Sequence, residues 1–258
     1  MMTNREILQV AMTQSAADSG CDPSDFEKTD PVIVTSRPHP DARRYLTLPF
    51  SCDLVSYGNN IVASVSDEYR EIVSAYIGKY PVEHCFETPN LHVLNDALLP
   101  LGQKICFMAE YFLPDADVLR ELSCPYEMRV LYPADFAGLY VPEWSNALSS
   151  HRKELDVLGV GAYDGGKLIG LAGCSADCDT MRQIGIDVLP EYRRQGIASA
   201  LTSRLALEIL ERGKVPFYCA AWSNIRSVRN AIRSGFRPAW VEVTAKPADF
   251  VDKMNGIG

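Results

Sequence analysis

The chain has 258 residues, more than a usual single domain, and its 47% hydrophobic and 22% charged residues exclude extensive disorder. A net charge of -8 argues against nucleic acid as a partner, because phosphate backbones are bound by basic surfaces. Eight cysteines without a Cys-x-x-Cys pair, and only four histidines, argue against a zinc site or a disulfide framework. We therefore expect reduced thiols and no metal.

Residues 5–17 predict a helix, which is followed by a polar stretch. Gln9, Thr13 and Gln14 interrupt its apolar positions, so the segment lacks the unbroken apolar core of a secretory signal. No stretch of the sequence approaches the length of a transmembrane span. We expect a cytoplasmic protein that does not associate with membranes.

The N-terminal half predicts a mixed α/β unit. Residues 53–65 hold two β-rich runs around Gly58-Asn59-Asn60, which is typical of a hairpin. The other expected elements are helices over residues 67–76 and 90–99 and a strand over residues 104–112. Proline, aspartate and other charged residues interrupt the apolar pattern between Leu113 and Pro125. The expected domains are therefore residues 1–120 and residues 121–258.

The second half begins with a predicted hairpin. Residues 157–163 and 168–174 are apolar runs joined by Asp164-Gly165-Gly166, a turn that favours tight strand reversal. Residues 184–188 predict a third strand, which Pro190 and Glu191 end. A sheet is therefore expected to lead directly into the segment that follows.

That segment, Arg193-Arg194-Gln195-Gly196-Ile197-Ala198, predicts a phosphate-binding turn. Gly196 can adopt backbone angles that a side chain forbids, so successive N–H groups can point at one anion. Apolar residues then recur every fourth position, which predicts a helix: Ile197, Leu201, Leu205 and Ile209. The positive end of this helix favours the same anion, so a pyrophosphate would be bound by backbone donors and by two arginines.

Beyond this helix the pattern continues with strand, helix and strand. Residues 216–222 predict a strand, and Ser223 or Asn224 the N-cap of a helix that runs to Ser234. Gly235 ends that helix, and residues 236–243 predict the last strand.

Two other nucleotide-binding motifs are excluded. The chain has no Gly-x-x-x-x-Gly-Lys-Ser/Thr run, so it is not a P-loop protein. Gly159-Val160-Gly161 begins a dinucleotide fingerprint, but Asp164 stands where the third glycine belongs and a turn follows in place of a helix.

The turn and its neighbours resemble the GNAT superfamily of acyl-CoA-dependent N-acetyltransferases. The superfamily signature is Arg or Gln, two residues, Gly, one residue, then Gly or Ala, and Arg193, Gly196 and Ala198 fill its defined positions. Asn224 and the Gly235-Phe236 pair also have counterparts. The resemblance implies an α/β fold with a mixed central sheet flanked by helices over residues 121–258. Residues 1–120 would form an N-terminal mixed α/β domain, either an unrelated unit or a degenerate acetyltransferase-like unit.

The resemblance also implies how acetyl-CoA, as co-substrate, would lie. The strand with Ile186 and Val188 would pair with the pantetheine arm, and Asn224 would approach that arm. The pyrophosphate would contact Arg193, Arg194, Gln195, Gly196, Ile197 and Ala198. Arginines 226, 229 and 233 share one helix face, which is either a solvated surface or a further contact to a cofactor phosphate.

The chain departs from the family at its usual proton-transfer positions. Ala231 stands where many members have a tyrosine, and Arg182 stands where some have a glutamate. The candidates for the base or another catalytic group are therefore Glu143, Asp187 and Cys219, beside Asp177, Asp179 or a water chain. Glu143 falls in the segment that often covers the acceptor site in the superfamily. Asp187 could equally be a structural acceptor, and Cys219 a packed thiol.

The expected function is transfer of an acetyl group from acetyl-CoA to a primary amine of a small molecule or a protein terminus. The alternative is a non-catalytic acyl-CoA-binding sensor or interaction module, which the departures at Ala231 and Arg182 would explain. A homodimer is the default oligomer. The sequence does not identify the acceptor.

Overall fold

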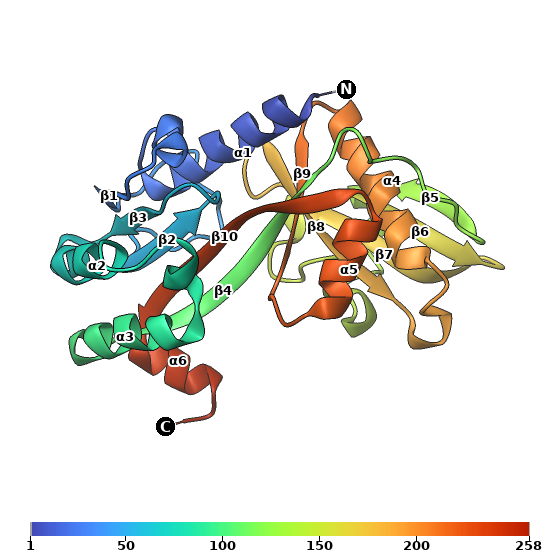
Figure 1. Cartoon of the computed structure of the whole chain (residues 1–258). Coiled ribbons are helices and arrows are strands. Elements are labelled where there is room, and N and C mark those ends of the chain that lie inside the picture. The colour runs from blue at the N-terminus through green and yellow to red at the C-terminus, as the bar shows by residue number, and fades with distance from the viewer. Residues whose placement is uncertain (1, 258) are drawn as a thin grey trace. The chain divides into compact units, whose positions relative to one another are not determined.

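A computed structural model describes residues 2–257, and the chain folds into two compact units (Figure 1). Unit 1 contains the N-terminal residues up to Ala11 and residues Tyr111–Pro238. Unit 2 contains residues Met12–Glu110 and the C-terminal residues from Ala239. Each unit is therefore assembled from segments that are far apart in the sequence.

Unit 1 is built on a mixed sheet with the strand order β9-β8-β7-β6-β5. Its strands are β5 (Glu127–Leu131), β6 (Asp156–Asp164), β7 (Lys167–Ser175), β8 (Met181–Val188) and β9 (Val215–Ala220). Neighbouring strands are antiparallel except β8 and β9, which are parallel. The predicted hairpin is confirmed as β6 and β7, and Gly165 and Gly166 make the turn with positive φ angles of 55° and 88°.

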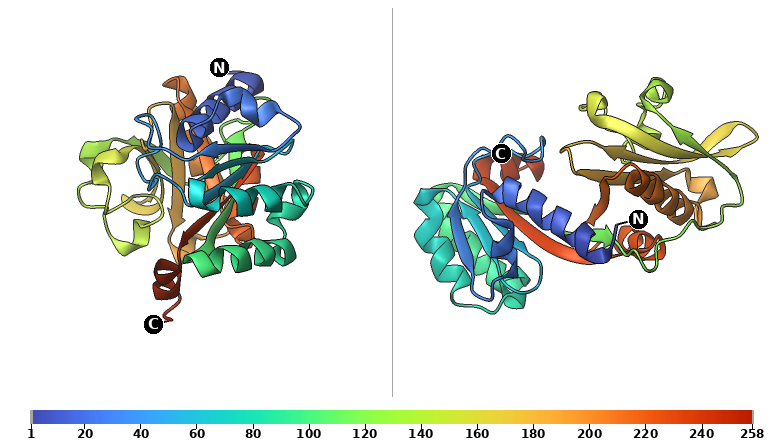
Figure 2. Two further views of the ribbon diagram at one scale, coloured as in Figure 1. Left: turned by 90° about the vertical axis from the view of Figure 1, so that its left-hand side faces the viewer. Right: turned by 90° about the horizontal axis from the view of Figure 1, so that it is seen from above.

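Helix α4 (Ile197–Glu211) lies along one face of this sheet (Figure 2). Ile197, Leu201, Leu205 and Ile209 are almost fully buried, as their four-residue spacing predicts. Helix α5 (Ile225–Arg233) follows β9 and begins at the N-cap residue Asn224. The order of strands and helices predicted for this half is therefore confirmed.

Unit 2 has the strand order β1-β3-β2-β10-β4. Its strands are β1 (Val32–Thr35), β2 (Cys52–Ser56), β3 (Val62–Val65) and most of β4 (Gln103–Pro114) and β10 (Phe236–Pro247), and its helices include α2 (Arg70–Ile77), α3 (Thr88–Leu98) and α6 (Ala248–Met254). One sheet face carries a core with Leu54, Val73, Leu94 and Val243. The expected hairpin is confirmed as β2 and β3.

The two units differ from the expected domains, residues 1–120 and 121–258. The chain passes between the units inside β4 and β10, and inside helix α1 (Asn4–Ser19). Because the chain passes between the units within continuous helices and strands, no change in amino-acid composition marks the boundary between the units in the sequence. None of the helices in residues 2–257 is both long and apolar enough to cross a membrane.

Candidate functional site

Strands β8 and β9 separate after a short paired stretch. Met181, Arg182 and Gln183 of β8 pair with Val215, Pro216 and Phe217 of β9. Beyond this point β8 stays paired with β7 as far as Val188, but within residues 2–257 its other edge has no pairing with β9. The N–H and C=O groups on that edge can therefore pair with an extended ligand, as an added strand would.

Cys219 lies where the two strands separate. Its sulfur accepts a hydrogen bond from Gln183 Nε2 at 3.1 Å, and the side chain is partly buried. The thiol is therefore held across the closed end of the opening between β8 and β9.

The segment 142–148 packs directly on β8. Asp187 accepts hydrogen bonds from the backbone N–H of Asn146 at 2.8 Å, from Asn146 Nδ2 at 2.6 Å and from the N–H of Ala147 at 3.0 Å. A Cβ atom on Gly185 would lie 1.8 Å from the carbonyl oxygen of Asn146. Glycine at 185 allows this close approach, and Asp187 fixes it. Its carboxylate is thus occupied by donors from the covering segment.

Glu143 belongs to that covering segment. It lies in a short 3₁₀ helix, Pro142–Trp144, whose Trp144 packs into a core with Phe136 and Leu171. The carboxylate of Glu143 is exposed and has no hydrogen bond or ion pair within residues 2–257. The buried tryptophan thus anchors a segment that presents an unpaired carboxylate.

The predicted phosphate-binding turn lies directly after β8. Residues 193–196 are exposed, and Gly196 is the N-cap of α4 with φ 82°. Arg194 has a positive φ of 66°, and it is the only non-glycine residue with a positive φ among residues 2–257. Such angles at a non-glycine residue cost energy and concentrate at ligand-binding loops. A Cβ atom on Gly196 would meet nothing within 4 Å, so the turn faces open space.

The start of α4 leaves backbone donors for an anion. Gly196 supplies no side-chain cap, and the first N–H to bond back into the helix is that of Ala200, to Gly196 at 3.1 Å. The N–H groups of Ile197, Ala198 and Ser199 precede the helical ladder and have no acceptor in it. Together with the helix dipole they suit a phosphate group.

Contacts from neighbouring elements hold the turn in place. Arg193 Nε donates to the carbonyl oxygen of Val188 at 2.9 Å, which ties the turn to the end of β8. Gln195 Oε1 accepts from the hydroxyl of Tyr126 at 3.0 Å. Arg194 makes no hydrogen bond or ion pair within residues 2–257. Of the two arginines expected at a pyrophosphate, one is therefore partly used for positioning and the other is unpaired.

Asn224 caps α5, since its side chain accepts from the N–H of Ser227 at 3.3 Å. The buried Asn230 was not predicted from the sequence. Its amide joins α5 to the first turns of α4, accepting from Ser199 Oγ at 3.0 Å and donating to Thr202 Oγ1 at 3.1 Å. One polar residue in a helix has no sequence pattern that distinguishes this role.

The remaining candidates lie elsewhere on unit 1. Asp177 is buried and accepts hydrogen bonds from Arg152 and Ser175, a structural arrangement. Asp179 is exposed, as are the arginines 226, 229 and 233 on α5.

Burial raises the pKa of Asp156 to about 6. Among residues 2–257 no cluster of three or more side chains could bind a metal ion.

Residues 117–239 match the family model of the GNAT acetyltransferases. Acetyl-CoA is the co-substrate of this family. No curated protein matches the sequence significantly.

Solved structures with a similar course of the chain include a GCN5-related N-acetyltransferase from Kribbella flavida, 17% identical with a TM-score of 0.47. The match covers 62% of this chain and 64% of that protein, just under two thirds of its length. An acetyltransferase of the GNAT family from Colwellia psychrerythraea is 14% identical, with 78% and 84% covered and a TM-score of 0.45. A Drosophila protein is 14% identical, with 95% and 90% covered and a TM-score of 0.48. Because these likenesses are distant, the family assignment depends on the family model alone.

Proposed function

We propose that this protein transfers an acetyl group from acetyl-CoA to a primary amine of a small molecule or a protein terminus, because residues 117–239 match the family model of the GNAT acetyltransferases. The observation that carries the proposal is the opening between β8 and β9 together with the turn that follows β8. An open strand edge and a set of free helix N–H groups suit the two polar parts of the coenzyme, its pantetheine amides and its diphosphate.

In the proposed complex the pantetheine arm pairs with the free edge of β8 at Ile186 and Val188. The diphosphate accepts hydrogen bonds from the N–H groups of Ile197 and Ala198, and Arg194 contributes its charge. Arg193, Gln195 and Gly196 shape the turn. Asn224 is better placed as a helix cap than as a coenzyme ligand, because its side-chain oxygen already accepts from Ser227.

The reaction requires a neutral amine. At pH 7, deprotonating an amine with a pKa near 10.4 costs roughly 4.6 kcal/mol, so a nearby base has a substantial effect. Glu143 is the proposed base, because its carboxylate is exposed and unpaired on the segment that packs over β8. Asp187 is the proposed positioning residue for that segment, and Cys219 packs at the closed end of the opening.

The remaining steps need few side chains. The amine nitrogen attacks the thioester carbonyl carbon, and the charge that develops on the carbonyl oxygen is stabilised by a backbone N–H on the free edge of β8. Collapse of the tetrahedral intermediate breaks the carbon–sulfur bond. Coenzyme A can leave as a thiolate without a general acid, since its thiol pKa is near 8.5. Ala231 in place of the family's tyrosine is compatible with this route.

The test is an acetyl transfer assay with purified protein, acetyl-CoA and a panel of primary amines, measured by release of free thiol. At least one amine should raise thiol release above hydrolysis. Glu143→Gln should lower kcat/KM for that amine by about 10²–10⁴-fold and leave the Kd of coenzyme A unchanged. Glu154→Gln removes another exposed carboxylate of unit 1 and should have no effect.

One result would contradict the proposed transfer, and another would contradict only the assignment of its base. If no amine is acetylated although coenzyme A binds, transfer to a primary amine is refuted and the non-catalytic acyl-CoA-binding role is favoured. If Glu143→Gln and Glu154→Gln are equally active on an acetylated amine, the reaction stands and Glu143 is not its base.

A further inference from the structure

A pocket lies on unit 1, at the end of β8 opposite the phosphate-binding turn. Its volume is about 240 Å³, below the roughly 300–1,000 Å³ of pockets for drug-sized ligands, so it suits a small molecule. The pocket is lined by the last residues of α4 and the chain that follows it, by the start of β8 and by neighbouring strands. The lining residues that matter here are Arg182, Arg212, Lys214, Val157, Leu158 and Ile209.

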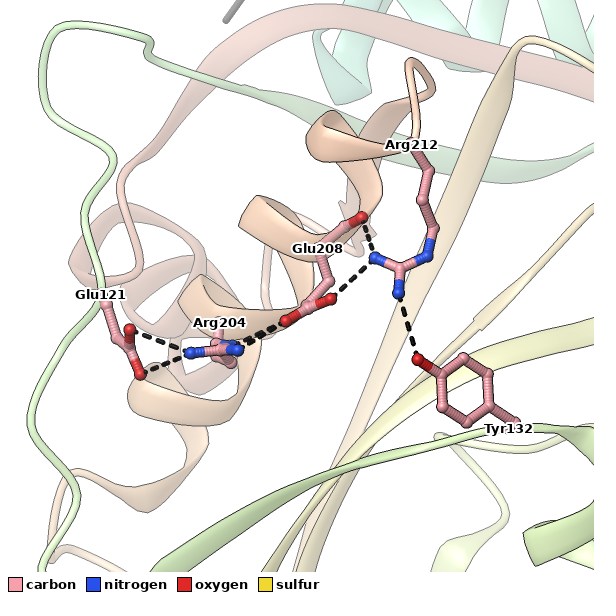
Figure 3. Close-up of polar contacts among 5 residues, drawn as sticks. All are labelled: Glu121, Tyr132, Arg204, Glu208 and Arg212. Carbon is pink, nitrogen blue, oxygen red and sulfur yellow. Dashed lines mark hydrogen bonds and ion pairs between the residues drawn. The ribbon is translucent and has the colours of Figure 1, made fainter.

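Within residues 2–257, only one of the three cations that line this pocket has a carboxylate partner. Arg212 Nη1 binds Glu208 Oε2 at 2.7 Å, and its Nη2 donates to the hydroxyl of Tyr132 at 3.4 Å (Figure 3). Glu208 is shared with Arg204, whose Nη2 lies 2.6 Å from Oε1, and Arg204 also binds Glu121 at 3.0 Å. Two carboxylates and two guanidinium groups thus form a neutral network, which fixes Arg212 in position.

Arg182 and Lys214 are outside that network. Arg182 Nη1 donates to the carbonyl oxygens of Cys178 and Met181, each at 2.7 Å, and these acceptors are uncharged. The backbone N–H of Lys214 donates to the carbonyl oxygen of Ile209 at 3.2 Å, but its ammonium group makes no hydrogen bond or ion pair within residues 2–257. Two positive charges in the pocket lining therefore have no counterion among the residues that the structure describes.

The rest of the lining does not supply that counterion. Val157, Leu158 and Ile209 are apolar, and the thiol of Cys174 is buried. Burial raises the pKa of this thiol to about 12, although Arg182 and Arg212 oppose the rise, so it is neutral at physiological pH. The pocket combines an apolar wall with uncompensated cations, which is the complement of an anion that carries an aliphatic chain.

We propose that this pocket binds a small monocarboxylate with a short aliphatic chain. Its carboxylate contacts Arg182 and Lys214, and its chain packs against Val157, Leu158 and Ile209. The site is separate from the phosphate-binding turn and does not depend on the proposed acetyl transfer.

The experiment measures binding of hexanoate to the whole protein by isothermal titration calorimetry at low ionic strength. Hexanoate should bind saturably, and more tightly than acetate, which lacks the chain, or hexan-1-ol, which lacks the charge. Saturating coenzyme A should leave this binding unchanged.

Lys214→Met should weaken hexanoate binding about tenfold, the effect expected for loss of one charge-assisted contact. Arg182→Met should do the same. Lys153→Met is the matched control, because Lys153 is an exposed lysine of unit 1 that contacts the Tyr140 ring outside this pocket. The Lys153→Met protein should bind hexanoate as tightly as the unaltered protein. Arg182 also orders the chain at Cys178, so a misfolded Arg182→Met protein would leave Lys214→Met to decide. Absence of binding, equal affinity in Lys214→Met and Lys153→Met, or displacement of hexanoate by coenzyme A would overturn the proposal.

Discussion

Replacing Gly185 by alanine should destabilise unit 1 strongly. The new Cβ atom would lie 1.8 Å from the carbonyl oxygen of Asn146 and 2.7 Å from its carbonyl carbon. Both are backbone atoms, so the clash is relieved only if the segment 142–148 moves away from β8. Overpacking of this kind costs about 1–3 kcal/mol. The movement would also break hydrogen bonds to the Asp187 carboxylate, each worth about 1.5–3 kcal/mol.

The expected loss is therefore about 3–5 kcal/mol, or roughly 10 °C in Tm for a chain of this size. Urea unfolding followed by tryptophan fluorescence is suitable, because Trp144 is buried in the same segment. Gly138→Ala is the matched control, since an added Cβ there meets nothing within 4 Å, and its change should be about 0.5 kcal/mol or less. If the Gly185→Ala and Gly138→Ala proteins unfold at the same urea concentration, the packing of this segment on β8 is wrong.

Three further substitutions test other parts of the two units. Glu208→Gln should lower the free energy of unfolding by about 1–2 kcal/mol, because Arg204 and Arg212 lose their shared carboxylate but stay partly solvated. An unchanged urea midpoint of unfolding would contradict the role of this ion-pair network. Burial raises the pKa of Asp156 to about 6, so between about pH 4 and pH 6 this carboxyl is protonated in the folded state and ionised in the unfolded state. The contribution of Asp156 to the free energy of unfolding therefore falls as the pH rises through this window. Asp156→Asn should remove that slope, and equal slopes in urea titrations from pH 4 to pH 7 would refute the assignment. Burial, followed by the charge of Glu242, raises the pKa of Asp53 in unit 2, and within residues 2–257 its Oδ1 has no hydrogen-bond partner. Asp53→Asn should therefore raise the free energy of unfolding at pH 7 by about 1–3 kcal/mol, and a loss of stability would show that the ionised carboxylate is stabilising.

Most local elements follow from short-range patterns in the sequence. The Asp164-Gly165-Gly166 turn specifies the β6–β7 hairpin, and the four-residue spacing after Gly196 specifies α4. Both patterns reflect backbone freedom and burial, which depend on neighbouring residues. The GNAT domain could be identified for the same reason, since its signature is one contiguous turn.

Contacts between distant residues could not be predicted. The sequence offers Asp187 either as a structural acceptor or as a base, but its donors, Asn146 and Ala147, lie 41 and 40 residues away with no shared pattern. The sequence also does not indicate that the chain passes from one unit to the other inside β4 and β10. A strand that continues from one unit into the next keeps the same alternation of side chains along its length. The catalytic assignments to Glu143, Asp187 and Cys219 stay predictions.

The affinity of a Gly196→Val protein for coenzyme A, measured by calorimetry, tests most directly whether the start of α4 binds the diphosphate. A β-branched residue is strained at φ 82°, so the turn should lose its shape. Gly102→Val is the control, since Gly102 has φ 75° in unit 2 and an added Cβ atom there meets nothing within 4 Å among the described residues. The Kd of coenzyme A should rise at least tenfold in Gly196→Val only, and that of pantetheine, which lacks the diphosphate, should stay the same. Equal coenzyme A affinity in the two variants would contradict this site.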